Sequence, residues 1–100
     1  MKSITSKELA KLIHERADFQ LIDVREAGEH AGFNIGGILL PLGSIVQHLA
    51  QIEKEKKVIV YCHKGIRSQI AIQKLQAKYP FTNLINLIGG TEAWKKEKEV

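Results

Sequence analysis

Apolar runs of strand length alternate along this chain with segments whose apolar residues recur at helical spacing. The runs lie at residues 19–24, 58–61 and 84–87, and they are nearly continuous in apolar residues. Such runs indicate strands buried on both faces, as in a parallel sheet, because a one-sided strand would alternate apolar with polar residues. Parallel strands need crossover connections, so the segments between them are expected to be helices packed on both faces of the sheet.

Helix signals accompany these runs. Thr5-Ser-Lys-Glu8 has the form of a capping box, which marks the start of a helix. Pro80 follows another stretch of helical spacing and marks its end, because proline disfavours a helical conformation in the residue before it. We expect helices over residues 6–16, over 44–54 with Ser44 as cap, over 67–78, and from Thr91 through Trp94.

The stretch over residues 26–43 is irregular. Five glycines and Pro41 interrupt it, so no long element fits there. We expect a loop with a brief helical turn, followed by a short strand at residues 38–40. The chain is therefore predicted to be an α/β protein with a small, mostly parallel sheet flanked by helices.

Length and charge narrow the possible classes of protein. One hundred residues, of which 44% are hydrophobic, suit one domain over residues 1–100, since two domains would each be too small to bury a core. The net charge of +4 is too moderate for a nucleic-acid binder. The first residues lack the apolar core of a secretion signal, and no apolar run reaches membrane-spanning length. We expect a cytoplasmic protein without nucleic-acid or membrane partners.

Cys62 is the only cysteine, and it has no partner for an internal disulfide, which fits a reducing compartment. It follows the run at 58–61 and stands in a short loop just before the helix predicted from Arg67. Peptide N–H groups at a helix start lack intrahelical partners, and the helix dipole adds partial positive charge there. This setting favours thiolate over thiol and makes Cys62 a candidate nucleophile.

The residues after Cys62 form a candidate anion-binding loop. Peptide N–H groups closing over the sulfur, together with positive charge from Lys64 and Arg67, would hold a small anion. Gly65 permits the tight backbone path, and Lys64 orients the anionic part of the substrate. For Arg67, contact with the substrate and bracing of the loop through a carboxylate are equal alternatives. The expected substrate-binding residues are His63, Lys64, Gly65, Ile66, Arg67 and Ser68.

His63 and Ser68 have secondary parts in this interpretation. Neighbouring residues in a loop usually point apart, so a rim position is favoured for His63 over that of a general base. Ser68 is interpreted as an early helix residue that pairs loop groups, because no base is spaced to activate it as a second nucleophile.

Two charged residues stand at the carboxyl end of the run at 19–24. Asp23 and Arg25 are interpreted as an ion pair that fixes loop geometry. This interpretation is favoured over one in which the two side chains contact the substrate. We expect no metal and no other cofactor, because one cysteine is available and the remaining histidines lack ligand spacing: His14, His30 and His48.

Four stretches, in this order, span nearly the whole chain: Leu21-Ile-Asp-Val-Arg-Glu26, residues 32–42, the loop 62–68, and residues 87–94. Together they resemble the rhodanese family of sulfurtransferases. The resemblance implies a rhodanese-like sheet of about five strands, and a structural role for Asp23 and Arg25. It also implies that Cys62 takes the outer sulfur of thiosulfate or a related persulfide donor, releases sulfite and holds a persulfide.

The resemblance further implies an acceptor: a thiol or cyanide, or a protein such as a thioredoxin-like or other sulfur-relay partner. Lys64 matches a position where members acting on thiosulfate often carry a basic residue. The chain departs from the commonest family pattern at Phe33, where His is frequent, and at Leu39, where Asn is frequent.

Two other functions remain as alternatives. Phosphatases and arsenate reductases of related fold have five residues between Cys and Arg, whereas four separate Cys62 from Arg67 here. The tighter loop suits a sulfur atom better than a tetrahedral phosphate. The second alternative is a non-catalytic interaction module of the same fold, although such modules often lack the cysteine.

Overall fold

The structure, a computed structural model of the chain, describes residues 1–98. Within them, five strands form one sheet in the order β1-β5-β4-β2-β3, and every pairing is parallel. The predicted α/β class and parallel sheet are confirmed. The strands are β1 (Ser3–Ile4), β2 (Phe19–Asp23), β3 (Ile38–Leu39), β4 (Lys57–Tyr61) and β5 (Leu84–Leu87).

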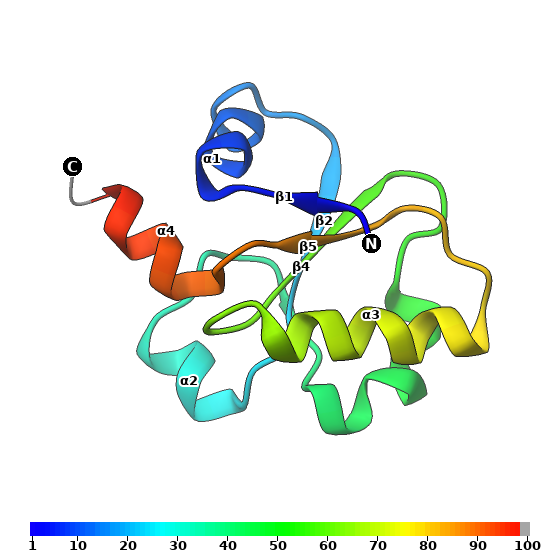
Figure 1. Cartoon of the computed structure of the whole chain (residues 1–100). Coiled ribbons are helices and arrows are strands. Elements are labelled where there is room, and N and C mark those ends of the chain that lie inside the picture. The colour runs from blue at the N-terminus through cyan, green and yellow to red at the C-terminus, as the bar shows by residue number, and fades with distance from the viewer. Residues whose placement is uncertain (99–100) are drawn as a thin grey trace.

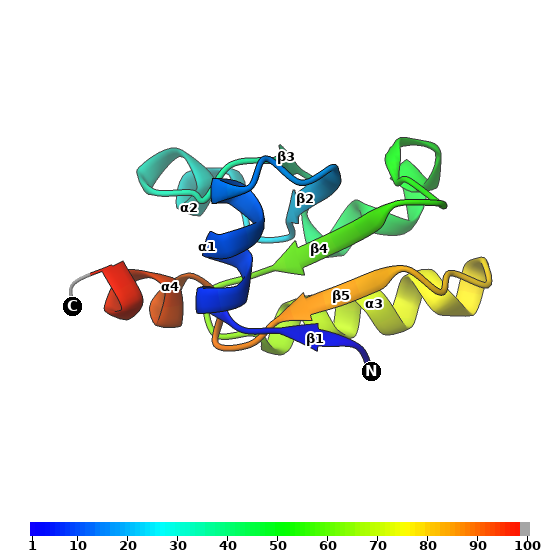
Figure 2. The same cartoon turned by 90° about the horizontal axis from the view of Figure 1, so that it is seen from above.

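Helices cover both faces of this sheet, as expected of crossover connections. Figure 1 shows α1 above the sheet, with α3 and the 3₁₀ helix η1 below it. Seen from above in Figure 2, α2 and α4 lie at the end of the sheet toward which the strand arrows point. None of the helices within residues 1–98 is long and apolar enough to cross a bilayer. Their bounds are α1 (Ser6–His14), α2 (Ala27–Gly32), η1 (Leu42–Gln51), α3 (Ile66–Lys78) and α4 (Gly90–Lys98).

Strand β4 lies in the middle of the sheet and divides the core into two parts. Val58 and Val60 face a cluster that includes Ile72 and Leu75 of α3. Ile59 and Tyr61 face the opposite cluster, where Leu9 of α1 and Trp94 of α4 pack. Because side chains alternate along a strand, Cys62 continues the α3 side and belongs to that cluster. The register of β4 thus points the thiol toward the start of α3.

Three helix boundaries differ from the sequence predictions. The capping box at Thr5 is present, but α1 ends at His14, and Arg16 has a positive φ of 55° that the helix does not tolerate. The segment predicted as a helix over 44–54 is the 3₁₀ helix η1. Ser44 is not its cap, because its hydroxyl and its N–H both donate to the carbonyl of Pro41.

The last helix begins at Gly90, so Thr91 lies inside it and is not its cap. Strand β1 was not predicted, because two residues give no periodic signal; it forms by pairing with β5.

Candidate active site

Cys62 lies in a turn that joins β4 to α3. Gly65 caps α3 with a φ of 93°, in the left-handed region that favours glycine. A Cβ at Gly65 would lie 3.0 Å from the Gly89 nitrogen and 3.3 Å from the Leu87 carbonyl oxygen. The close approach and the positive φ together explain why this turn needs glycine. The predicted order of strand, thiol, glycine and helix is present, with α3 beginning at Ile66.

The Cys62 sulfur accepts hydrogen bonds from the backbone of the turn. The N–H of Gly65 donates to Sγ at 3.0 Å, and the N–H of Ser68 donates at 3.4 Å. Ile66 and Arg67 occupy the first turn of α3, where N–H groups have no intrahelical acceptor. The partial positive charge of this helix end therefore faces the side of the turn that holds the sulfur.

Helix α4 holds the turn from its other side. The N–H of Thr91 donates to the Cys62 carbonyl at 2.9 Å, and the N–H of Glu92 donates to the His63 carbonyl at 3.0 Å. A Cβ at Gly90 would lie 2.2 Å from the Cys62 carbonyl oxygen, so the two backbones touch here. The carbonyls of the turn are thus held by α4, whereas two of its N–H groups donate to the sulfur. Sequence reasoning read Gly89-Gly90 as a turn and missed this contact.

A shallow pocket opens over the thiol. It is lined by Cys62, His63, Lys64, Ile66 and Arg67, all of which the sequence assigned to the site. Cys62 itself is 1% exposed, whereas Ile66 on the rim is 64% exposed. Within residues 1–98, no ion pair joins Lys64 to an acidic group, so its charge remains available to an anion in the pocket.

Arg67 is bound by a carboxylate. Its Nη1 and Nη2 donate to Oε1 and Oε2 of Glu29 in α2, each at 2.8 Å. The Arg67 hydrogen bonds hold the pKa of Glu29 at about 2, below its usual value of 4.5. Of the two alternatives for Arg67, this is the bracing arrangement. Glu29 was missed by sequence reasoning; its only local signal is the pairing with Glu26 in a capping box at the start of α2.

His63 faces α4 with both of its ring nitrogens. Nδ1 lies 3.3 Å from Thr91 Oγ1, and Nε2 lies 3.5 Å from Glu92 Oε2. The side chain is about half exposed and borders the pocket. The structure thus places the imidazole at the rim and gives it no hydrogen bond with the Cys62 sulfur.

Ser68 lies beneath the sulfur and is fully buried. Its Oγ is 3.4 Å from Cys62 Sγ, and its hydroxyl donates to Oδ1 of Asn86 in β5. Asn86 is 4% exposed and was not singled out from the sequence.

Asp23 and Arg25 form a buried ion pair at the end of β2, with Nη2 and Oδ2 2.8 Å apart. His30 Nδ1 lies 2.8 Å from the same carboxylate oxygen, and Arg25 also donates to the Phe33 carbonyl. Burial alone would raise the pKa of Asp23, but the hydrogen bonds from Arg25 and His30 outweigh it, so the pKa lies below its usual value. The pair fixes the turn between β2 and α2 and makes no hydrogen bond with the Cys62 sulfur.

Tyr61 secures the segment that follows α2. Its hydroxyl accepts from the Ile35 N–H at 3.1 Å and donates to the Gly36 carbonyl at 2.9 Å. Burial raises the pKa of Tyr61 to about 12. Two buried anchors, the Asp23–Arg25 pair and Tyr61, therefore place α2 and its Glu29 against the active-site turn.

Comparisons with known proteins agree with this geometry. The family model described as "Rhodanese-like domain" matches residues 5–97. The thiosulfate sulfurtransferase GlpE of Coxiella burnetii is 35% identical over 95 residues, covering 94% of this chain and 87% of that protein. A protein named sulfurtransferase from Allochromatium vinosum is 30% identical over 97 residues, covering 96% of this chain and 90% of that protein.

Solved structures show the same fold. The crystal structure of a rhodanese-like domain protein from Staphylococcus aureus superimposes with a TM-score of 0.84 at 32% identity. The superposition covers 94% of this chain and 91% of that one.

Proposed function

Since the chain belongs to the rhodanese-like domain family, as its four motifs predicted, we propose that it is a thiosulfate sulfurtransferase that works through a persulfide on Cys62. The coarser assignment, a sulfurtransferase of this family, follows from the relatives. The proposal of a thiosulfate substrate and a persulfide rests on the surroundings of the Cys62 sulfur. The sulfur accepts two peptide N–H groups at the start of α3 and lines an open pocket beside Lys64.

In the first half-reaction, the Cys62 thiolate attacks the outer sulfur of thiosulfate. The sulfur–sulfur bond of thiosulfate breaks, and its electron pair leaves with sulfite. The new persulfide carries its negative charge on the outer sulfur, which lies in the pocket. The N–H groups of Ile66 and Arg67, at the first turn of α3, are placed to stabilise that charge.

In the second half-reaction, a thiophilic acceptor attacks the outer sulfur, and Cys62 leaves as a thiolate. Cyanide would become thiocyanate, and a thiolate would become a persulfide. Because Cys62 both enters and leaves as a thiolate, the cycle needs no general base at the sulfur. That agrees with a His63 whose two nitrogens face α4.

Charge at the pocket supports an anionic donor. Glu29 neutralises Arg67, so Lys64 supplies the positive charge that would attract the sulfonate part of thiosulfate. The same ion pair argues against the phosphatase alternative, since a phosphate would have to compete with a bidentate carboxylate for the guanidinium.

The acceptor in this proposal is a protein thiol, and a thioredoxin-like or other sulfur-relay protein has the right chemistry. The pocket is shallow, and its rim carries the exposed Ile66 beside Lys64. A rim of this kind leaves the outer sulfur within reach of a partner's cysteine. A reducing compartment, the cytoplasm, is the proposed location because the lone Cys62 must be kept as a thiol.

Intact mass after incubation with thiosulfate tests the function. We expect a gain of one sulfur atom, its removal by cyanide with release of thiocyanate, and no gain in the Cys62→Ser variant. An unmodified protein, under conditions that load a control sulfurtransferase, would contradict the proposal. Hydrolysis of an aryl phosphate that depends on Cys62 would support the phosphatase alternative instead.

A further inference from the structure

A chain of three buried polar groups lies on the inner side of the candidate nucleophile. Cys62 Sγ is 3.4 Å from Ser68 Oγ, and the Ser68 hydroxyl donates to Oδ1 of Asn86. The three residues are 1%, 0% and 4% exposed. Neither Ser68 nor Asn86 lines the pocket over the thiol. The reaction described above gives Asn86 no part.

The number of hydrogen-bond donors limits which arrangements this chain of three polar groups can adopt. Ser68 has one hydroxyl proton, and when that proton is given to Asn86, the Ser68 oxygen offers Cys62 only lone pairs. That arrangement suits a thiol, which donates its S–H to the oxygen. A thiolate only accepts, so Ser68 must then turn its proton toward the sulfur. Asn86 Oδ1 would lose its donor unless the amide also turned and let Nδ2 donate to Ser68.

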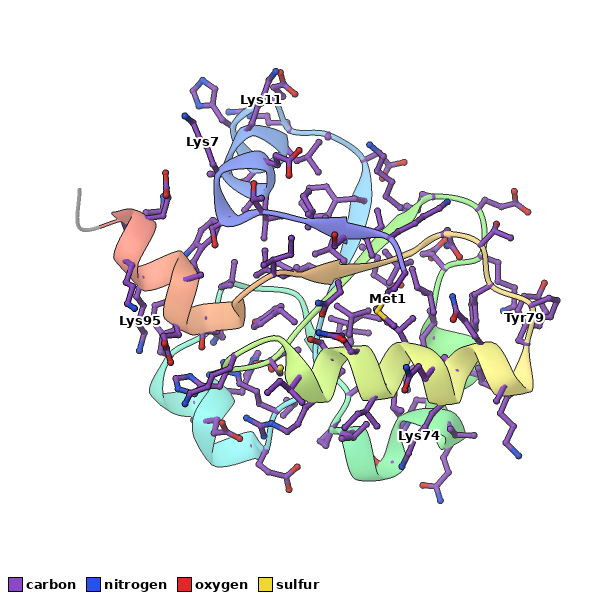
Figure 3. The ribbon with its side chains drawn as sticks, in the orientation of Figure 1. Met1, Lys7, Lys11, Lys74, Tyr79 and Lys95 are labelled. Atoms are coloured by element: carbon purple, nitrogen blue, oxygen red, sulfur yellow. The ribbon has the colours of Figure 1, made fainter. Side chains whose placement is uncertain are left out.

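The position of Asn86 allows the amide to turn. Besides touching Ser68, Asn86 borders a second hollow on the other side of the chain of groups, where solvent is available to whichever amide atom faces away from Ser68. Neither orientation then leaves a buried polar atom unpaired. Met1, which lines this hollow, is labelled above the ribbon of α3 in Figure 3. The hollow is lined by Met1, Ser3, Gln69, Asn86 and Ile88.

We infer that Asn86 is a positioning residue that sets the direction of the Ser68 hydroxyl, so that one hydrogen-bond chain stabilises both the thiol and the thiolate of Cys62. The inference rests on the proposed function only in taking the thiolate as the working form. No proton passes along the chain. The thiol proton leaves to solvent through the pocket, while the Ser68 hydroxyl and the Asn86 amide turn in place.

Other charged groups surround Cys62, and they must stay constant in a test. They come from its own turn, from α2 and α3, from the end of β2 and from α4: His63, Lys64, Glu26, Glu29, Arg67, Asp23, Arg25 and Glu92. The variants below alter none of them, but Asn86→Asp adds a carboxylate of its own, and the Ser68→Ala background measures the direct effect of that charge.

The rate of Cys62 alkylation by iodoacetamide, followed against pH, reports the thiolate directly. Asn86→Asp has only acceptors and keeps the Ser68 proton away from the sulfur, so the midpoint of the profile should rise by about one pH unit. Asn86→Leu has about the same size but removes the acceptor that stabilises the thiol arrangement, so the midpoint should fall by about half a unit. In the Ser68→Ala background, Asn86→Leu should leave the midpoint unchanged.

Shifts of the same sign for the two Asn86 variants would overturn the inference, and so would an equal effect of Asn86→Leu with and without Ser68. If Asn86→Leu does not fold, Asn86→Asp decides alone: its upward shift must shrink by at least half in the Ser68→Ala background. Ser3→Ala, a change in the same hollow, should leave the profile unaltered. Alkylation needs no sulfur donor, so failure of thiosulfate loading would not obscure the result.

Discussion

The turn at residues 62–68 and the segment at residues 26–37 both build the candidate site, but by different means. The turn acts through its backbone: N–H groups face the sulfur, and carbonyls bind α4. The segment acts through side chains, because Glu29 reaches Arg67 while buried anchors on β2 and β4 hold the segment in place. Backbone geometry should therefore decide whether the thiol reacts, and the segment should decide how firmly the turn is braced.

Removing the anchor of the segment should give the largest effect on stability. Arg25→Ala leaves the buried Asp23 carboxylate without its bidentate partner, and the free energy of unfolding should fall by about 3–5 kcal/mol. Lys56→Ala, which removes an exposed ion pair with Asp18, should leave the free energy of unfolding nearly unchanged. Urea unfolding measures both. If folded Arg25→Ala protein loads sulfur far more slowly than wild type, the segment also controls reactivity, and the division of roles between segment and turn is wrong.

Gly90→Ala tests the turn through its backbone contact with α4. Its Cβ would overlap the Cys62 carbonyl at a φ of 56°, so α4 must move off the turn, at a cost of about 2–3 kcal/mol. Sulfur loading should fall by at least tenfold in protein that is still folded. Gly28→Ala, in α2 with nothing within 4 Å of the new Cβ, should load normally and be slightly more stable. Normal loading by Gly90→Ala would show that the α4 contact does not shape the turn.

Lys64→Ala separates charge from backbone within the turn itself. Use of thiosulfate should weaken by about tenfold, equivalent to about 1.4 kcal/mol, because the Lys64 cation at the pocket is lost. Loading from an uncharged sulfur donor should change little, since the N–H groups that hold the sulfur remain. Steady-state rates with the two donors make the comparison. Equal losses with both would exclude a role in attracting the anion.

Glu29→Gln should give the smallest effect, and its pH dependence identifies the link between the two regions. The pKa of Glu29 is lowered to about 2, so the ion pair contributes stability above the usual value of 4.5 and loses it as pH falls toward 2. Wild type should exceed the variant by less than about 1 kcal/mol at neutral pH, because the pair is partly exposed. The difference should close between pH 4.5 and 2 in denaturant titrations. A gap that persists at pH 2 would mean that the carboxylate is not what braces Arg67.

The turn could be predicted because its parts are contiguous. An apolar strand, a thiol, a glycine and a helix follow one another within a dozen residues, and each leaves a local signal. Asp23 and Arg25 were also found, since they stand two residues apart at a strand end. Parallel topology then explains why Asp23 and Cys62 both lie at the carboxyl ends of neighbouring strands.

The partners that complete the site could not be predicted, because they are distant in sequence. Glu29 is 38 residues from Arg67, and Asn86 is 18 residues from Ser68. Their pairing depends on how α2 and β5 pack, which no local pattern records. The type of helix η1 was predicted wrongly for another reason. Over ten residues, the apolar spacing of a 3₁₀ helix with a break at His48 is close to that of an α-helix.

The pairing of β1 with β5 has a consequence for how the chain folds. Ser3 and Ile4 pair with Asn86 and Leu87, so docking of the first strand joins residues that are 83 positions apart in the sequence. Closing so long a loop costs entropy before any contact repays it, and all-parallel sheets are correspondingly slow to assemble. We therefore expect β1 to join late on the folding pathway. Contacts of Ile4 should then change the unfolding rate more than the folding rate.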